Sequence, residues 1–263
     1  MNLGKIKTFL IVLFLGINIY LVFSLFMTTR FFADKKTVEH TADILYEFGV
    51  EIDKNTVPKY VVNLKNIDTS NAVYTDTFKS VNKNGMFIVR DGGFTCRKKN
   101  KGIGKKSDKA IKKEVEDFLA GYGFNTGYMK FGEITKASED RKFNIYCYAG
   151  GYRIFDSIIK VAVSEDAFTL NGTWYEPLTN KVKSRSRSRD TVYITSILIN
   201  MVHNDSIMKN APFKITDIDY GYLAGTSYGE GAHVRTSALP YYKLKDNKGN
   251  VYYYDAKNGT YLK

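Results

Sequence analysis

The sequence predicts an α+β protein in which a single N-terminal transmembrane helix precedes an extracytoplasmic region of helices packed on antiparallel sheets, in two similar subdomains. Three observations lead to this fold class. One apolar run near the N-terminus is long enough to cross a bilayer. A helix followed by antiparallel strands then recurs three times along the chain. Short polar turns such as DNKGN, Asp246 to Asn250, join neighbouring strands.

The apolar run extends from Phe9 to Met27 and is interrupted only by small or polar residues such as Asn18. At about 1.5 Å per residue it spans roughly 28 Å, close to the hydrocarbon thickness of a bilayer. Bulky residues follow the run where a signal peptidase would require small ones. An uncleaved anchor is therefore expected. The basic residues at its two ends do not decide its orientation, and a short internal tail with a large external domain is the commoner arrangement.

This reading divides the chain into four parts. They are a cytoplasmic tail at 1–8, a transmembrane helix at 9–29, subdomain 1 at 30–125 and subdomain 2 at 126–263. A hydrophobic content of 44% with 14% aromatic residues is typical of folded domains. The expected location is the cell membrane, with a single pass, the N-terminus in the cytoplasm and the C-terminal domain outside.

The first helix of the folded region is expected from Asp34 to Gly49. Val38, Ala42 and Leu45 recur at helical spacing on one face, and Gly49 is a typical helix end. Strands are expected at 60–66, 71–78, 86–90 and 93–97, with KNG and DGG as turns between the last three.

A second helix is expected from Ser107, whose hydroxyl is suited to cap a helix N-terminus. Its apolar stripe consists of Ile111, Val115, Phe118 and Leu119. Strands are expected next at 127–135, 141–149, 157–165 and 167–176. A third helix at 190–204 is expected to precede strands at 213–223, 234–246, 250–256 and 260–262.

The net charge of +12 predicts attraction to anionic surfaces. Lys5, Lys7 and Arg30 contribute three of these charges, which leaves +9 on residues 31–263. For an anchored external domain this favours weak contact with anionic wall polymers or lipid head groups over nucleic acid, which is not expected as a partner. The alternative reading is that the excess of lysine reflects the base composition of the source genome.

No catalytic, cofactor or metal motif is found, and the protein is not expected to be an enzyme. GIGKKS, Gly102 to Ser107, lacks the glycine spacing of a phosphate-binding loop. Cys96 and Cys147 are too few for a disulfide scaffold and badly spaced for a metal site. They are expected to be separate thiols, and the alternative is one bridge between them in an oxidising compartment. His233, in the glycine-rich loop GEGAHV, leaves open a wall-modifying enzyme in which distant carboxylates converge on it.

Asn18 is the candidate for partner recognition. In lipid the hydrophobic effect does not draw helices together, so a side-chain hydrogen bond of roughly 0.5 to 2 kcal/mol can select a partner helix. At spacings of three, four and seven residues, the positions that share its face are Phe14, Leu15, Leu21, Val22 and Leu25.

Four segments of the sequence resemble the YycI family. The most specific is KIKTFLIVLFLGINIYLVFSLF, Lys5 to Phe26, which has the family's Lys-x-Lys-Thr start and central Asn element. The others are FGVEIDKNTVPK, IFDSIIKVAV and YYKLKDNKGNVYYYDAKNGTYLK. The last is also similar to the closing hairpin of PepSY-type domains.

The resemblance implies an accessory regulator that acts by contact and not by a reaction. Its partners would be a YycH-like protein and the sensor histidine kinase WalK, also called YycG, in a two-component system that controls cell-wall metabolism in Gram-positive bacteria. Family members differ in whether they restrain or support the kinase. The alternative function is a PepSY-like extracytoplasmic module that binds or inhibits a secreted hydrolase or a peptide.

Overall fold

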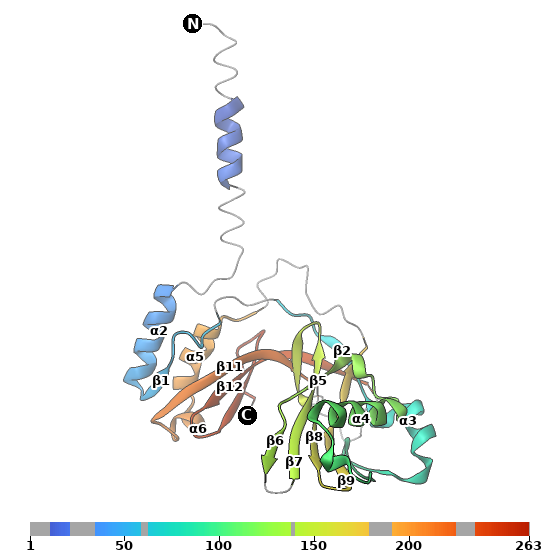
Figure 1. Cartoon of the computed structure of the whole chain (residues 1–263). Coiled ribbons are helices and arrows are strands. Elements are labelled where there is room, and N and C mark those ends of the chain that lie inside the picture. Colours follow the sequence, from blue (N-terminus) through green and yellow to red (C-terminus); the bar gives the residue numbers. More distant parts are fainter. Residues whose placement is uncertain are drawn as a thin grey trace, which may run out of the picture.

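The computed structural model describes residues 11–21, 35–58, 63–137, 140–178, 191–224 and 235–262 (Figure 1). A helical segment covers residues 11–21. The other helices are α2 (Lys35–Glu47), α3 (Asp76–Val81), α4 (Asp108–Gly121), α5 (Ile194–Val202) and α6 (Asp205–Met208). Short 3-10 turns lie at Ala72–Tyr74, Asn82–Asn84, Ile103–Lys105 and Thr126–Tyr128.

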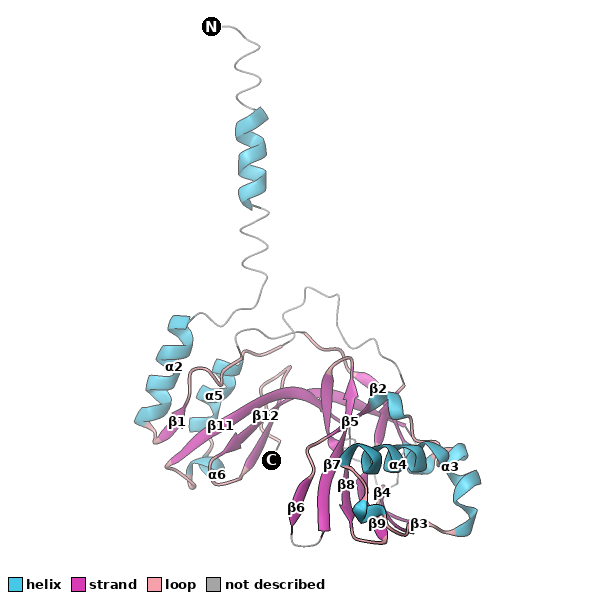
Figure 2. Cartoon of the chain, viewed as in Figure 1, coloured by secondary structure: helices cyan, strands magenta, loops and turns pink. Residues whose placement is uncertain are grey.

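Strands account for more of the described residues than helices do (Figure 2). The first seven are β1 (Val50–Ile52), β2 (Ile67–Asn71), β3 (Phe87–Arg90), β4 (Gly93–Lys99), β5 (Met129–Phe131), β6 (Thr135–Ala137) and β7 (Asp140–Ala149). The others are β8 (Tyr152–Val163), β9 (Ala167–Thr173), β10 (Tyr175–Pro177), β11 (Phe213–Leu223), β12 (Arg235–Asp246) and β13 (Val251–Asp255).

The strands form one 13-stranded mixed sheet among the described residues. Its main path runs β10-β2-β12-β11-β8-β9-β4-β3, while β1, β13 and the strands β5 to β7 pair at its sides. Two parallel pairings join distant parts of the chain: β1 lies beside β11, and β8 meets β11 where Ile154 pairs with Tyr222. The predicted class, helices packed on antiparallel sheets, is therefore wrong. Hairpin turns are visible in a sequence, but these long-range parallel pairings are not.

The expected single transmembrane helix at 9–29 is not found in the described residues either. None of the helices described there has both the length and the apolar composition required to cross a bilayer.

Two large hydrophobic clusters and a small third one, formed by Phe155, Leu223 and Tyr241, make up the core of the described residues. In the larger one, helix α4 covers the sheet formed by β7, β8, β9 and β4, and its side chains Ile111, Val115 and Leu119 are fully buried. Aromatic rings fill the space between them, and Phe118 stacks on Phe87 at 5.7 Å between ring centroids. Burying a side chain of this size contributes roughly 1.5–3 kcal/mol.

The second cluster packs α2 and α5 against β11, β12 and β13. It contains Leu45 of α2, Leu198 of α5, and Ile215, Leu244 and Tyr254 of the strands, all at most 1% exposed. Segments from both halves of the chain therefore share this core, because α2 and β1 precede residue 125 and the remaining elements follow it.

Local patterns predicted most elements correctly. Helix α4 begins after Ser107, whose hydroxyl accepts a hydrogen bond from the Ala110 N–H as expected of an N-cap. The strand predicted at 71–78 is wrong. Asn71 and Thr75 instead cap two short helical turns through their side chains, and this local bonding outweighs the β-branched composition of the segment.

Candidate functional site

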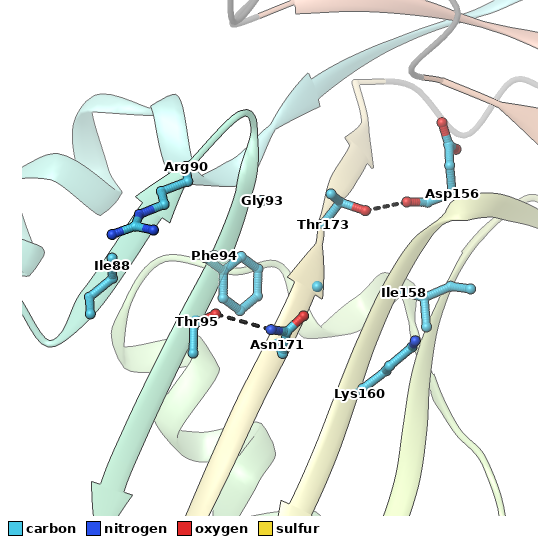
Figure 3. A pocket seen from close by; sticks show the side chains of 11 residues that line it. Ile88, Arg90, Gly93, Phe94, Thr95, Asp156, Ile158, Lys160, Asn171 and Thr173 are labelled. Carbon is cyan, nitrogen blue, oxygen red and sulfur yellow. Dashed lines mark hydrogen bonds between the residues drawn. The ribbon is translucent and has the colours of Figure 1, made fainter.

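A hollow of about 640 Å³ lies over strands β3, β4, β9 and β8 (Figure 3). Its lining residues are Ile88, Arg90, Gly93, Phe94, Thr95, Asp156, Ile158, Lys160, Asn171, Gly172 and Thr173. On β4, Phe94 and Cys96 are buried in the core while Thr95 between them is exposed. The hollow therefore lies mainly on the face of the sheet that helix α4 does not cover.

The β3–β4 turn at one end of the hollow is held from behind by side chains. Asp91 and Gly92 both have positive φ angles, 48° and 77°, as a two-residue turn of the type I′ class requires. The Asn71 Nδ2 donates to the Gly92 carbonyl at 2.9 Å, and the Gly92 N–H donates to the Tyr74 hydroxyl at 3.0 Å. Asn71 is only 1% exposed, so this support is shielded from water.

Two glycines shape the hollow, one by leaving a gap above the sheet and one by allowing two strands to approach closely. Gly93 has no side chain at a position where its neighbours Arg90 and Thr173 carry one, and this gap opens the hollow. A Cβ on Gly172 would lie only 2.0 Å from the Ile158 carbonyl oxygen. Any larger residue at 172 would therefore push β9 away from β8.

The hydroxyl and carboxyl groups of the hollow are engaged in structural bonds. The Thr173 hydroxyl donates to the backbone carbonyl of Asp156. Both carboxylate oxygens of Asp156 accept from the Ala224 N–H at 3.0 Å. The Thr95 hydroxyl accepts from the Asn171 side-chain amide at 3.1 Å.

The remaining charges of the hollow are cationic. Arg90 and Lys160 are both exposed and come from strands on opposite sides of it. Among the eleven lining residues, all of which the structure describes, none is a serine, cysteine or histidine. This composition suits the binding of an anionic group better than nucleophilic or acid–base chemistry.

The edge of the sheet next to the hollow is closed at one residue. The Asn82 side chain donates from Nδ2 to the Phe87 carbonyl at 3.0 Å and accepts from the Phe87 N–H at 2.9 Å. One amide thus satisfies both backbone groups of a residue on the edge strand β3, which limits pairing with a further strand.

The side chains predicted for partner recognition lie partly in the described segment 11–21. Phe14, Leu15 and Leu21 are 70%, 60% and 55% exposed, and they share a helical face with Asn18. The Asn18 Nδ2 donates to the Phe14 carbonyl at 2.9 Å. That bond uses one of the two N–H groups of the amide.

Val22 and Leu25, the remaining two positions of this face, lie outside the described residues, and so does His233. Within the described ranges, no group of three or more His, Cys, Asp and Glu side chains is arranged to hold a metal ion.

The cysteines are separate thiols, as the sequence predicts. Cys147 packs in the same cluster as Phe143 and Ile145, and Cys96 lies in that cluster too. Burial raises the pKa of Cys96 to about 11, although Lys98 opposes the shift, and burial also raises the pKa of Cys147 well above its ordinary value. Neither thiol is activated as a nucleophile.

The lysine-rich loop before α4 is partly neutralised by acidic side chains. The Lys105 Nζ lies 2.7 Å from the Glu165 Oε1, and the Lys106 Nζ lies 2.7 Å from the Glu114 Oε1. The Gly104 backbone sits so close to β8 and β9 that a Cβ there would be 2.8 Å from Glu165 Cα. Part of the positive charge of this loop is therefore paired within the fold.

Sequence reasoning did not identify the hollow. A glycine inside a strand is a signal of close backbone approach, and Gly172 was inside a correctly predicted strand. The rows of side chains that surround it depend on the strand order β3-β4-β9-β8. In this order β4 pairs with β9, which lies far from it in the sequence, and no local pattern indicates that pairing.

Comparisons with known proteins give little guidance. No protein-family model and no curated protein matches the chain. Among solved structures, an uncharacterized protein from Eubacterium rectale is 10% identical with a TM-score of 0.39, covering 81% of this chain and 89% of that chain. The Bacillus megaterium YpeB C-terminal domain is 11% identical with a TM-score of 0.32, covering 73% and 96%. Neither similarity, at these scores, shows the fold or the function of this chain.

Proposed function

We propose that the protein is a non-catalytic regulator that acts by binding other proteins. The observation that carries this proposal is the composition of the hollow: its hydroxyl and carboxyl groups make structural hydrogen bonds, and its two exposed charged side chains, Arg90 and Lys160, are cations. Such a surface can bind a partner but offers no nucleophile paired with a base.

The proposed partners are a sensor histidine kinase of the WalK type and a YycH-like protein, at the extracytoplasmic side of the cell membrane. The sequence resemblance to the YycI family supports this choice of partners. The exposed apolar side chains of residues 11–21 support a second contact, made with an apolar surface of a partner protein.

The test is affinity purification of the tagged full-length protein from its own membranes. We expect the kinase and the YycH-like protein to co-purify with the wild type and to be reduced when Arg90 and Lys160 are both changed to Glu. Changing the exposed Lys136 and Lys257 to Glu is the matched control, because it alters the net charge equally. Absence of the kinase from the wild-type sample would refute the proposal. Recovery of a secreted hydrolase in its place would favour the PepSY-like alternative.

A further inference from the structure

The side chains around the hollow form two rows that cross four strands in register. The first row, read from β3 to β8, is Ile88, Thr95, Asn171 and Lys160. The second row is Arg90, Gly93, Thr173 and Ile158. Each row therefore has one isoleucine and one cation at its ends, and the order is reversed between the rows.

This register places Arg90 and Lys160 at diagonally opposite corners. Three strand spacings separate β3 from β8, about 14 Å, and two residues along a strand add about 7 Å. The Cα atoms of the two cations are then about 16 Å apart. Carboxylates four residues apart on an extended chain lie on the same side and about 13 Å from one another. The long side chains of Arg90 and Lys160 can span the difference.

The other two corners favour a polypeptide over a simple polyanion. Ile88 is 59% exposed, and Ile158 is partly exposed on the opposite side of the hollow. Apolar side chains of a bound peptide would cover these two residues, whereas a polyphosphate chain would gain nothing from them. The exposed amide of Asn171 offers hydrogen bonds to a peptide backbone near the centre.

The ligand is expected to lie across the face of the sheet and not along its edge. Asn82 already satisfies both backbone groups of Phe87 on the edge strand β3, so little of that edge is open to another strand. Gly93, in the middle of the second row, leaves room for a backbone to approach the sheet.

We infer that the hollow binds an extended acidic segment of a protein partner. Two carboxylates four residues apart pair with Arg90 and Lys160, and apolar side chains on the same face of the extended segment contact Ile88 and Ile158. This inference rests on the proposed function, since it names the chemistry that a partner must present to the same site.

The test uses purified full-length protein and a fluorescently labelled twelve-residue peptide in which Thr-Val-Thr separates two glutamates. Anisotropy titration at low salt should show binding at least tenfold tighter than for the same peptide with both glutamates replaced by glutamine. Changing Arg90 and Lys160 to Glu should weaken binding at least tenfold. The control pair Lys136→Glu and Lys257→Glu should change it less than threefold, and Ile88→Ser should weaken it about threefold.

Equal affinity for the glutamate and glutamine peptides would overturn the inference, and so would equal affinity of the double variant and its control. Competition by polyphosphate as effective as the unlabelled peptide, with no effect of Ile88→Ser, would overturn it in favour of a general anion site. If the double Glu variant has a lowered melting temperature, the double variant Arg90→Gln and Lys160→Gln takes its place in the titration, because it removes the two charges without reversing them. If the double variant loses co-purification of the kinase but the wild-type protein does not bind the glutamate peptide, the proposed function stands and only the acidic segment is refuted.

Discussion

The carboxylate of Asp246 organises the turn between β12 and β13, and its removal should destabilise the folded region measurably. It is 1% exposed. One oxygen accepts from the Lys248 and Asn250 N–H groups at 2.9 and 2.8 Å. The other accepts from the Asn250 amide at 2.8 Å and the Tyr252 hydroxyl at 2.9 Å.

The size of the effect follows from which donors water can reach. Lys248 and Asn250 are exposed, so water can replace the carboxylate at their N–H groups, at a net cost of about 1 kcal/mol. Tyr252 is 4% exposed, and removing the carboxylate that accepts its hydroxyl proton costs about 1–3 kcal/mol more. Asp246→Ala should therefore lower the free energy of unfolding by about 2–4 kcal/mol, which corresponds to a fall in melting temperature of roughly 4–16 °C.

The same carboxylate should make stability depend on pH in a defined direction. Burial by itself raises the pKa of Asp246, but the hydrogen bonds from Asn250, Tyr252 and Lys248 outweigh it and hold the pKa below its ordinary value. A pKa lowered by folding stabilises the protein above the unfolded value of about 3.9, and this stabilisation is lost as the pH falls through the folded-state pKa. The difference in stability between wild type and Asp246→Asn should be constant from about pH 5 to 8 and shrink below about pH 4.

Equilibrium urea unfolding, followed by circular dichroism, measures both effects. Asp43→Ala on the exposed side of α2 is the matched control, for which we expect a change within about 0.5 kcal/mol. A loss below about 1 kcal/mol for Asp246→Ala, or a loss equal to that of the control, would refute the reasoning.

Three further predictions use single substitutions or chemical labelling. Gly172→Ala should lower the free energy of unfolding by more than about 2 kcal/mol, because its Cβ would lie 2.0 Å from a carbonyl oxygen of β8. Gly121→Ala in α4, where a Cβ would meet nothing within 4 Å, should be neutral or stabilising. Thermal melts of the two variants compare them directly. Cys96 and Cys147 should react with a thiol reagent at pH 8 only after denaturation, and rapid labelling of the native protein would show that they are less buried than described. Asn18→Leu should preserve helical content and reduce co-purification with the partner complex, and equal recovery of mutant and wild type would exclude a role of the amide.

Local signals in the sequence account for the elements that were predicted correctly. Ser107 followed by apolar residues at helical spacing defines α4, because capping and amphipathic burial are both determined within about one helix length. Alternating burial along β7 likewise depends only on residues two apart.

The features that were missed depend on residues far apart in the chain. The parallel contact of Tyr222 with Ile154 and the position of β12 between β2 and β11 decide the sheet, and neither has a local pattern. The hollow has the same origin, since Arg90 and Lys160 become neighbours only through the order β3-β4-β9-β8. Helix α3 was missed for a different reason: the Thr75 cap competes successfully with strand propensity over a very short range.

Site-specific photo-crosslinking tests the proposed function most directly. A photoreactive residue at position 88, within the hollow, should crosslink the full-length protein to the sensor kinase or the YycH-like protein in native membranes. The same residue at position 136, on β6, should give at least tenfold less of that product. Equal crosslinking from both positions, or none from position 88 while the partners still co-purify, would contradict the proposal that this hollow is the binding surface.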